Sequence, residues 1–215
     1  MKKSRLLLAA LAAGVMIAGC GSKETAFTPE TSCIYISEEG ELSGALVEPC
    51  EGDVDTEDLT KYLESAVIRF NQESGAEGDA RNKQGADRLP AALNSVTKDE
   101  NAVRVVFDYA SVEDLIRFRQ TEDNEDDSNT VTALEVKPVS DATDWLIAAD
   151  YEKADGGAAA LDEMKKETRG KVVRIEGGGT FRFAGEVLYL ALDAEKMNEY
   201  TVTVPDGGNA YVVFR

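Results

Sequence analysis

The sequence predicts an α+β fold, with helices and antiparallel strands in different parts of the chain. Three observations support this prediction. An amphipathic helix pattern follows a short hairpin pattern, strands alternate with short helices in the middle, and residues 171–215 have a nearly continuous strand pattern. Strands that gather at one end, instead of alternating regularly with helices, favour α+β over repeated βαβ units. We expect residues 32–215 to form one such domain.

The first twenty residues have the pattern of a lipoprotein signal peptide. Lys2, Lys3 and Arg5 supply positive charge, and an apolar run of thirteen residues follows at 6–18. A helix needs about 20 residues to span a bilayer. The run is therefore too short for a membrane span and fits a cleaved signal.

A lipobox ends this run. Residues 17–20 are Ile-Ala-Gly-Cys, in which an aliphatic and two small residues precede a cysteine. Small residues let the backbone enter a signal peptidase, and the thiol accepts a diacylglycerol group. We expect cleavage of residues 1–19, lipid attachment at Cys20, and residence on the extracytoplasmic face of the cell membrane. The alternatives are an ordinary secretory signal that contains Cys20 by chance and a buried N-terminal helix.

Residues 20–31 are expected to form the lipidated N-terminus and a flexible tether. Gly21–Thr31 is small and polar and contains Pro29. A random coil of about 11 residues reaches roughly 17–20 Å on average. Cleavage removes three positive charges and changes the formal charge from −18 to −21. An anionic membrane repels such a domain, so attachment depends on acyl chains, and stable anchoring needs more than one.

The folded part is expected to begin with a β-hairpin and a helix. Strand patterns at 33–37 and 42–47 flank turn-forming residues. Asp55 is a typical helix N-cap, and Gly75 is a typical stop. The apolar residues between them recur at helical spacing on one face. They are Leu59, Tyr62, Leu63, Ala66, Val67 and Phe70.

Shorter elements follow. Ser111 and Asp114 have the spacing of a capping box, with Asp in place of Glu, ahead of a short helix. Gly177–Gly179 and Pro205–Asn209 are rich in turn-forming residues and separate the strands of an expected C-terminal antiparallel β-meander. The expected strands are 93–97, 103–109, 131–136, 171–176, 180–184, 186–192, 201–204 and 210–214, and the expected further helices are 141–151 and 158–168.

Cys33 and Cys50 remain after lipidation. An even pair of cysteines in an exported chain suggests a disulfide. The bond would close a loop of about 17 residues and contribute roughly 3 kcal/mol in the loop-entropy model. Two free, buried thiols are the alternative.

Composition excludes several functions. The chain has no histidine, which rules out Ser-His-Asp and Cys-His catalysis and any zinc site that needs imidazole. It has 41 acidic and 23 basic residues, so nucleic acid, which basic side chains bind, is not an expected partner. No motif indicates a catalytic residue, a metal ligand or a cofactor.

The acidic run 122–127 is a candidate Ca²⁺ site, because calcium prefers oxygen ligands. An EF-hand register can be drawn through it. The register uses Asn124, Asp126, Ser128, Val131 and Glu135. Its first position is Asn instead of Asp, its sixth is Asn129 instead of Gly, and Pro138 would interrupt the outgoing helix. A solvated loop is the simpler explanation.

Three further groups have simpler structural explanations than a functional one. A set of acids at the start of the first helix meets the helix dipole favourably. These acids are Asp53, Asp55, Glu57 and Asp58. Trp145 could line a sugar pocket but is more often a core residue. Gly177–Thr180 lacks the lysine and the spacing of a phosphate loop and indicates a tight turn.

Several segments together resemble a known group of proteins. After the lipobox come Tyr35–Glu41, the amphipathic helix, Val103–Leu115 as a strand that leads into a capped helix, and a final strand at Tyr211–Arg215. This order resembles small lipoproteins of Gram-positive anaerobic bacteria. The resemblance is loose over most of the chain and implies the location alone, because that group has no assigned activity and carries over no catalytic residue.

The expected function is that of a membrane-anchored extracytoplasmic lipoprotein that serves as a non-catalytic binding or interaction module. Its partner would be an unidentified protein or small molecule. Two alternatives stay open. One is a cell-envelope enzyme that acts on glycan through paired carboxylates with raised pKa values. The other is a Ca²⁺-dependent structural or adhesive module.

Overall fold

The computed structural model describes residues 27–50, 52–121 and 129–215. These residues contain four α-helices and twelve strands, and the strands form two sheets, sheet A and sheet B. The predicted α+β class is confirmed. None of the described helices is both long enough and apolar enough to cross a bilayer.

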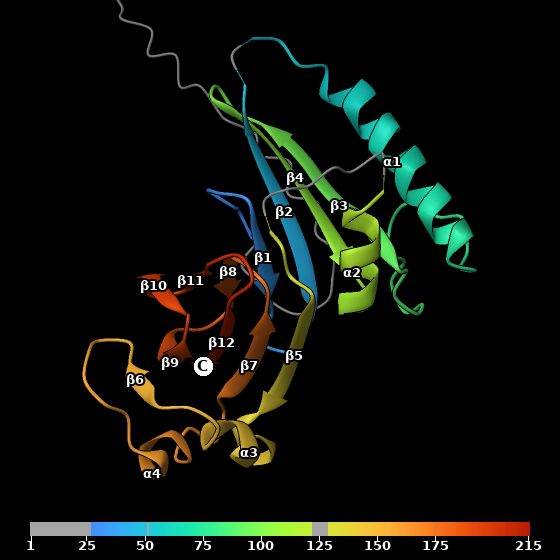
Figure 1. Cartoon of the computed structure of the whole chain (residues 1–215). Helices are drawn as coiled ribbons and strands as arrows, with labels where there is room; N and C mark the ends of the chain where they lie inside the picture. Colours follow the sequence, from blue (N-terminus) through green and yellow to red (C-terminus); the bar gives the residue numbers. More distant parts are fainter. Residues whose placement is uncertain (1–26, 51, 122–128) are drawn as a thin grey trace, which may run out of the picture.

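Sheet A contains seven strands and is built around the expected hairpin. The strands are β1 Cys33–Ile36, β2 Leu42–Pro49, β3 Ala91–Lys98, β4 Ala102–Tyr109, β8 Gly179–Phe183, β10 Glu195–Asn198 and β11 Thr201–Val204. Their order is β10-β11-β8-β1-β2-β4-β3. β1 pairs antiparallel with β2, with Cys33 opposite Ala45, and parallel with β8. The long strands β2, β3 and β4 are seen side by side in Figure 1.

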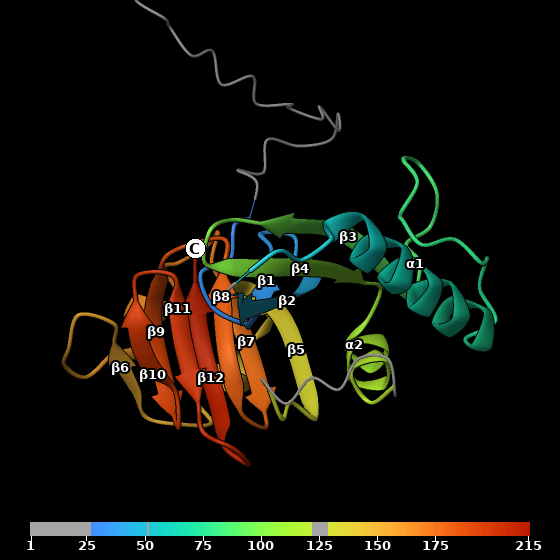
Figure 2. The same cartoon turned by 90° about the horizontal axis from the view of Figure 1, so that it is seen from above.

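Sheet B contains five antiparallel strands in the order β5-β7-β12-β9-β6. The strands are β5 Ala133–Pro138, β6 Tyr151–Lys153, β7 Lys171–Glu176, β9 Val187–Leu192 and β12 Asn209–Phe214. Figure 2 shows that they cross the direction of β3 and β4 steeply, so the two sheets pack as separate layers and not as one continuous surface.

The C-terminal strands are divided between the two sheets. β7, β9 and β12 belong to sheet B, whereas β8, β10 and β11 belong to sheet A. The expected antiparallel series is present, but within it only β10 and β11 pair in chain order. Residues 171–215 are therefore an integral part of both sheets and not a separate subdomain. β10 escaped prediction because its four residues are all exposed and show no apolar alternation.

The chain passes from sheet B to sheet A at Gly177 and Gly178. Gly177 has a φ of +98°, and a Cβ atom there would lie 2.2 Å from the carbonyl oxygen of Thr130. The Thr130 N–H donates to the Gly178 carbonyl at 2.8 Å, and the Gly178 N–H donates to Thr130 Oγ1 at 2.9 Å. The glycines separate two strands as expected, but they form a bend between the sheets and not a tight turn, and the close approach of two backbones explains why this bend needs glycine.

The first helix, α1 (Thr56–Glu73), packs on β3 and begins where the sequence predicts. Asp55 Oδ1 accepts hydrogen bonds from the backbone N–H groups of Glu57 and Asp58 at 2.9 and 3.2 Å. Asp55 is therefore the N-cap, and the neighbouring acids lie at the positive end of the helix dipole.

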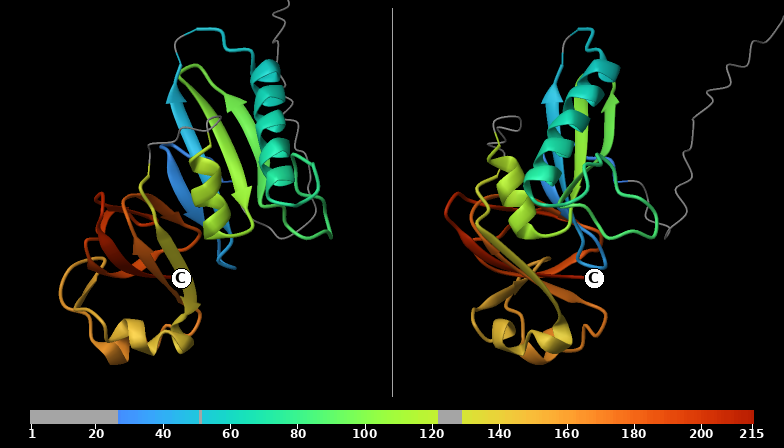
Figure 3. Two further views of the ribbon diagram at one scale, coloured as in Figure 1. Left: turned by 45° about the vertical axis from the view of Figure 1, so that its right-hand side comes forward. Right: turned by 90° about the vertical axis from the view of Figure 1, so that its right-hand side faces the viewer.

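The second helix, α2 (Val112–Arg119), has Ser111 as its N-cap, but Asp114 bonds to the Ser111 hydroxyl instead of the backbone N–H that a full capping box uses. Ser111 Oγ accepts from the Asp114 N–H at 3.1 Å and donates to Asp114 Oδ2 at 2.6 Å. Figure 3 shows α1 and α2 on the same side of sheet A. Phe118 of α2 is buried, with its ring centroid 5.0 Å from that of Phe107 in β4.

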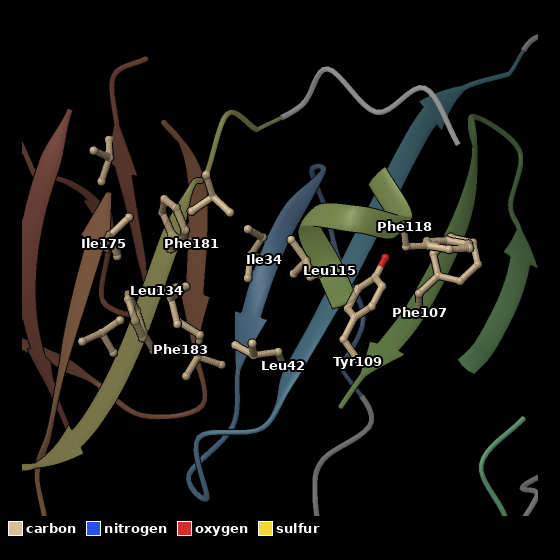
Figure 4. Packing of buried hydrophobic residues seen from close by; sticks show 14 of the residues in the cluster. Ile34, Leu42, Phe107, Tyr109, Leu115, Phe118, Leu134, Ile175, Phe181 and Phe183 are labelled. Atoms are coloured by element: carbon tan, nitrogen blue, oxygen red, sulfur yellow. The ribbon is translucent and has the colours of Figure 1, made fainter. Parts of the chain in front are cut away.

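The main hydrophobic core joins the two sheets and both helices in one cluster. Burial of a large apolar side chain contributes about 1.5–3 kcal/mol, so this shared core holds the layers together. Figure 4 shows two parts of it, Ile34, Leu134, Ile175, Phe181 and Phe183 between the sheets, and Phe107, Tyr109, Leu115 and Phe118 beside α2.

A smaller cluster covers the outer face of sheet B. The covering segment contains a 3₁₀ turn at Val139–Asp141, α3 at Thr143–Leu146 and α4 at Leu161–Met164. Trp145 is 6% exposed and packs in this cluster, with its ring centroid 6.2 Å from that of Tyr211. Trp145 is therefore a core residue, as the simpler of its two explanations predicts.

The expected helices at 141–151 and 158–168 are wrong in extent. α3 and α4 are single turns, and residues 151–153 form β6 instead. Tyr151 pairs with Ala191 in sheet B, which ends any helix before it. Gly156 and Gly157 both have positive φ and begin the return of the chain toward α4.

The other face of sheet A, which we call the open face, carries none of the described helices. Residues 27–32 lie on it. The ring of Phe27 stacks on that of Tyr35, with centroids 4.4 Å apart, and Arg104 Nε donates to the carbonyl oxygen of Pro29 at 2.9 Å. The expected free tether at 20–31 is therefore wrong from Phe27 onward, and its earlier residues lie outside the described part of the chain.

Candidate functional site

Two adjoining hollows beside sheet B form the candidate site. The first, which we call the mixed hollow, has a volume of about 390 Å³ and is lined by acidic, basic and apolar side chains. Its lining residues are Lys153, Ala154, Asp155, Glu163, Lys166, Glu167, Glu186, Val187, Leu188, Tyr189 and Lys196. Its volume falls in the range of small-ligand sites, about 300–1,000 Å³.

The second hollow, which we call the basic hollow, has a volume of about 380 Å³. It is lined by Glu38, Glu39, Arg169, Lys171, Phe214 and Arg215. Arg215 Nη1 lies 2.6 Å from Oε2 of Glu167, which lines the mixed hollow. This ion pair lies between the two hollows, since each hollow is lined by one of its two residues.

Strand register positions the mixed hollow. β6 pairs with β9, so Lys153 lies opposite Tyr189. The turn of α4 brings Glu163 Oε2 to 2.9 Å from Lys153 Nζ. The hydrogen bond between them raises the pKa of Lys153 and lowers the pKa of Glu163, so both side chains stay charged near neutral pH.

Tyr189 supplies a protonated hydroxyl group. Burial raises the pKa of this phenol, and the carboxylates of Glu167 and Glu163 raise it further. Because the phenol stays protonated, it can donate a hydrogen bond to a ligand or to a neighbouring carboxylate throughout the neutral range.

Four cations of the site form no ion pair with another residue in the described part of the chain, namely Lys166, Arg169, Lys171 and Lys196. Lys153 and Arg215, in contrast, are paired with glutamates. Lys166 lines the mixed hollow and Lys171 lines the basic hollow, on opposite sides of the Arg215–Glu167 ion pair. The site can therefore attract an anionic group from either side.

The two hollows are balanced in charge, in contrast to the chain as a whole. Together they are lined by six basic and six acidic side chains, whereas the chain carries a net charge of −18. A ligand with both an anionic and a cationic group would find a partner for each.

The expected disulfide is not formed. Cys33 and Cys50 are both free thiols, the first buried and the second partly exposed. The reason is strand register, because Cys33 lies opposite Ala45 and Cys50 follows five residues further along the chain. Strands rise about 3.4 Å per residue, which separates the two cysteines by roughly 17 Å, whereas a disulfide needs Cα atoms about 4.4–6.8 Å apart.

The candidate Ca²⁺ register falls largely outside the described residues, which lack 122–128. Its last position, Glu135, lies in β5 and not at the start of a helix, and its side chain lies 3.7 Å from Arg174 Nη1. The described residues contain no group of three or more acidic or cysteine side chains that could hold a metal ion.

The paired-carboxylate alternative requires a carboxyl group whose pKa is raised. Glu163, the carboxyl group best placed within the mixed hollow, has a lowered pKa because Lys153 donates a hydrogen bond to it. Glu163 is thus suited to holding a cation and unsuited to the role of general acid.

No protein-family model matches the chain, and neither a curated protein nor a solved structure does so.

The sequence singled out Cys20, Cys33 and Cys50, and none of them lies in the hollows. Cys20 is outside the described residues. Lys166, Lys171 and Tyr189 were missed, because solitary lysines and a strand tyrosine form no motif. Tyr189 of β9 and Lys171 of β7 come together because both strands pair with β12, and Lys166 follows α4.

Proposed function

We propose that this protein is a lipid-anchored, extracytoplasmic binding module, attached through Cys20, whose ligand occupies the mixed and basic hollows. The observation that carries the proposal is a set of cations without an ion pair in the described residues, within a charge-balanced site on a strongly acidic chain. These cations are Lys166, Arg169, Lys171 and Lys196. The absence of histidine and of a catalytic motif favours binding over chemistry.

The ligand class follows from charge. A simple anion is repelled by the domain as a whole, and a simple cation would be held anywhere on its acidic surface. A zwitterionic molecule, such as a short peptide, is not repelled at long range and meets opposite charges within the hollows. Screening over about 8 Å at physiological salt makes such local pairing more important than the net charge.

Thermal unfolding in the presence of candidate ligands tests the binding function. The panel contains dipeptides and tripeptides of each charge type, together with sugar acids and inorganic phosphate. A zwitterionic peptide is expected to raise the melting temperature more than phosphate does, because ligands that bind only the folded state stabilise it.

Two site variants and one control locate the ligand. Lys166→Ala and Lys171→Ala are each expected to weaken binding about tenfold, which corresponds to about 1.4 kcal/mol. Lys61→Ala removes an exposed lysine on α1, where it pairs with Glu57 and Asp58, and should leave binding unchanged. Equal affinities in all four proteins would place the ligand elsewhere.

The anchor is tested separately. Cys20→Ala is expected to yield an uncleaved protein without lipid, detected by incorporation of a labelled fatty acid. If the variant were still processed and still carried lipid, the proposed attachment site would be wrong.

A further inference from the structure

We infer that the open face of sheet A is turned toward the membrane, with the layer of lipid headgroups as its partner. The inference rests on the lipid anchor at Cys20 proposed above. It goes beyond that proposal because it assigns an orientation to the folded domain. The side chains that define this face include Tyr35, Ser43, Thr97, Arg104, Asp108 and Arg182.

The chain is fastened to this face where the described residues begin. Phe27 stacks on Tyr35 of β1, the central strand of sheet A, with an angle of 17° between the ring planes. The guanidinium of Arg182 lies 5.9 Å from the centre of the Phe27 ring. Arg104 holds the carbonyl of Pro29, and the Val47 N–H donates to Ser32 Oγ at 2.9 Å. The attachment point is thus on the open face and not at the rim of the domain.

Six residues separate Cys20 from Phe27. Fully extended, the seven Cα–Cα steps span at most about 25 Å, and as a coil they span about 13–16 Å on average. A domain of this size has a radius of gyration of about 16 Å, so its opposite side lies roughly 40 Å from the attachment point. The domain cannot present that opposite side to the membrane unless the contacts of Phe27 break.

Charge permits the same orientation. On the open face, Arg104 and Arg182 offset Asp108 and Asp99, the partner of Arg104 at the strand end, and the remaining acids are Glu30 and Glu195. The Asp108 carboxylate is also satisfied, since it accepts from Ser43 Oγ at 2.7 Å and from Asn94 Nδ2 at 2.9 Å. With two basic and four acidic side chains, the open face has a formal charge of about −2 in a chain of charge −18, so an anionic bilayer repels it only weakly.

Short-range quenching in vesicles tests the orientation. The lipidated protein, purified from membranes, is placed in phosphatidylcholine–phosphatidylglycerol vesicles with nitroxide-labelled headgroups. A fluorophore is attached at Thr97→Cys, on the open face, or at Ile147→Cys, which is 64% exposed beyond α3. Both variants carry Cys50→Ser, and Cys33 is too buried to react.

Quenching at position 97 is expected to exceed that at position 147 several-fold. Phe27→Ala should reduce this difference, whereas Tyr62→Ala, which alters an exposed ring on α1, should preserve it. Equal quenching at both positions, in protein that floats with the vesicles, would overturn the orientation but leave the anchor intact. Failure of the wild type to float would overturn the anchor and this inference with it.

Discussion

The side chain of Asn71 and the backbone of Ala91 exchange two hydrogen bonds across twenty residues of chain. The Ala91 N–H donates to Asn71 Oδ1 at 3.0 Å, and Asn71 Nδ2 donates to the Ala91 carbonyl at 2.8 Å. Nδ2 also donates to the carbonyl of Asp79 at 2.8 Å. The Asn71 side chain is fully buried. Its hydrogen bonds connect α1 to the following loop and to the start of β3.

Asn71→Ala is expected to reduce the free energy of unfolding by about 2–4 kcal/mol, because buried backbone groups lose their partners at about 1–3 kcal/mol each. Asn71→Asp should be at least as harmful, since its second oxygen would face two carbonyls. Urea unfolding measures both effects. Ser65→Ala on the same helix removes an exposed hydroxyl and serves as the control. A loss no greater than that of the control would contradict the role of Asn71.

Gly177→Ala is expected to destabilise the protein by more than about 3 kcal/mol, or to prevent folding. The added Cβ would lie 2.2 Å from Thr130 O, in a residue whose φ is +98°. Gly207→Ala is the matched variant, because Gly207 also has positive φ, +70°, but has open space around it. Backbone strain alone costs about 1–2 kcal/mol. Thermal unfolding of the two variants separates the steric clash from the strain, and equal losses would exclude a clash.

The two thiols should differ in reactivity. Cys50 is partly exposed and should react with a maleimide in the folded protein, whereas Cys33 is buried and should react only after unfolding. Mass spectrometry of the labelled protein, without prior reduction, counts the thiols. Two labels after unfolding are expected, and none would show that the cysteines are joined.

Stability should fall at alkaline pH because of Cys33. Burial raises the pKa of its thiol from 9.0 to about 11, although the positive charge of Arg182 opposes the shift. Above the usual pKa the unfolded chain releases a proton that the folded protein retains, so the free energy of unfolding decreases between about pH 9 and pH 11. This change in the pKa corresponds to about 3 kcal/mol of unfolding free energy.

Cys33→Ala isolates this effect. Urea unfolding across the alkaline range is measured for both proteins, because Tyr151 and Tyr189 also have raised pKa values and contribute in the same direction. The wild type should lose more stability than the variant over that range. Parallel curves would show that the thiol does not titrate as its burial requires.

Signals within a few residues predicted much of the secondary structure. The N-caps at Asp55 and Ser111 and the hairpin of β1 and β2 are all confirmed, because each depends on neighbours close in sequence. The helix expected at 141–151 was too long, because Tyr151 pairs with Ala191 in sheet B. The helix expected at 158–168 is reduced to the single turn α4. The disulfide failed because strand register, and not loop length, separates the cysteines.

The sequence by itself determined the α+β class, the starts of α1 and α2 and the first hairpin, and it predicts the lipid anchor at Cys20. Only the tertiary structure decided that the C-terminal strands enter both sheets, that Phe27 lies on the open face, and that Lys166 and Lys171 flank one ion pair. The physical reason is the distance along the chain over which each kind of interaction acts. Caps and periodicity act over one or two turns of chain, whereas pairing between β1 and β8, or between β6 and β9, depends on burying a shared core.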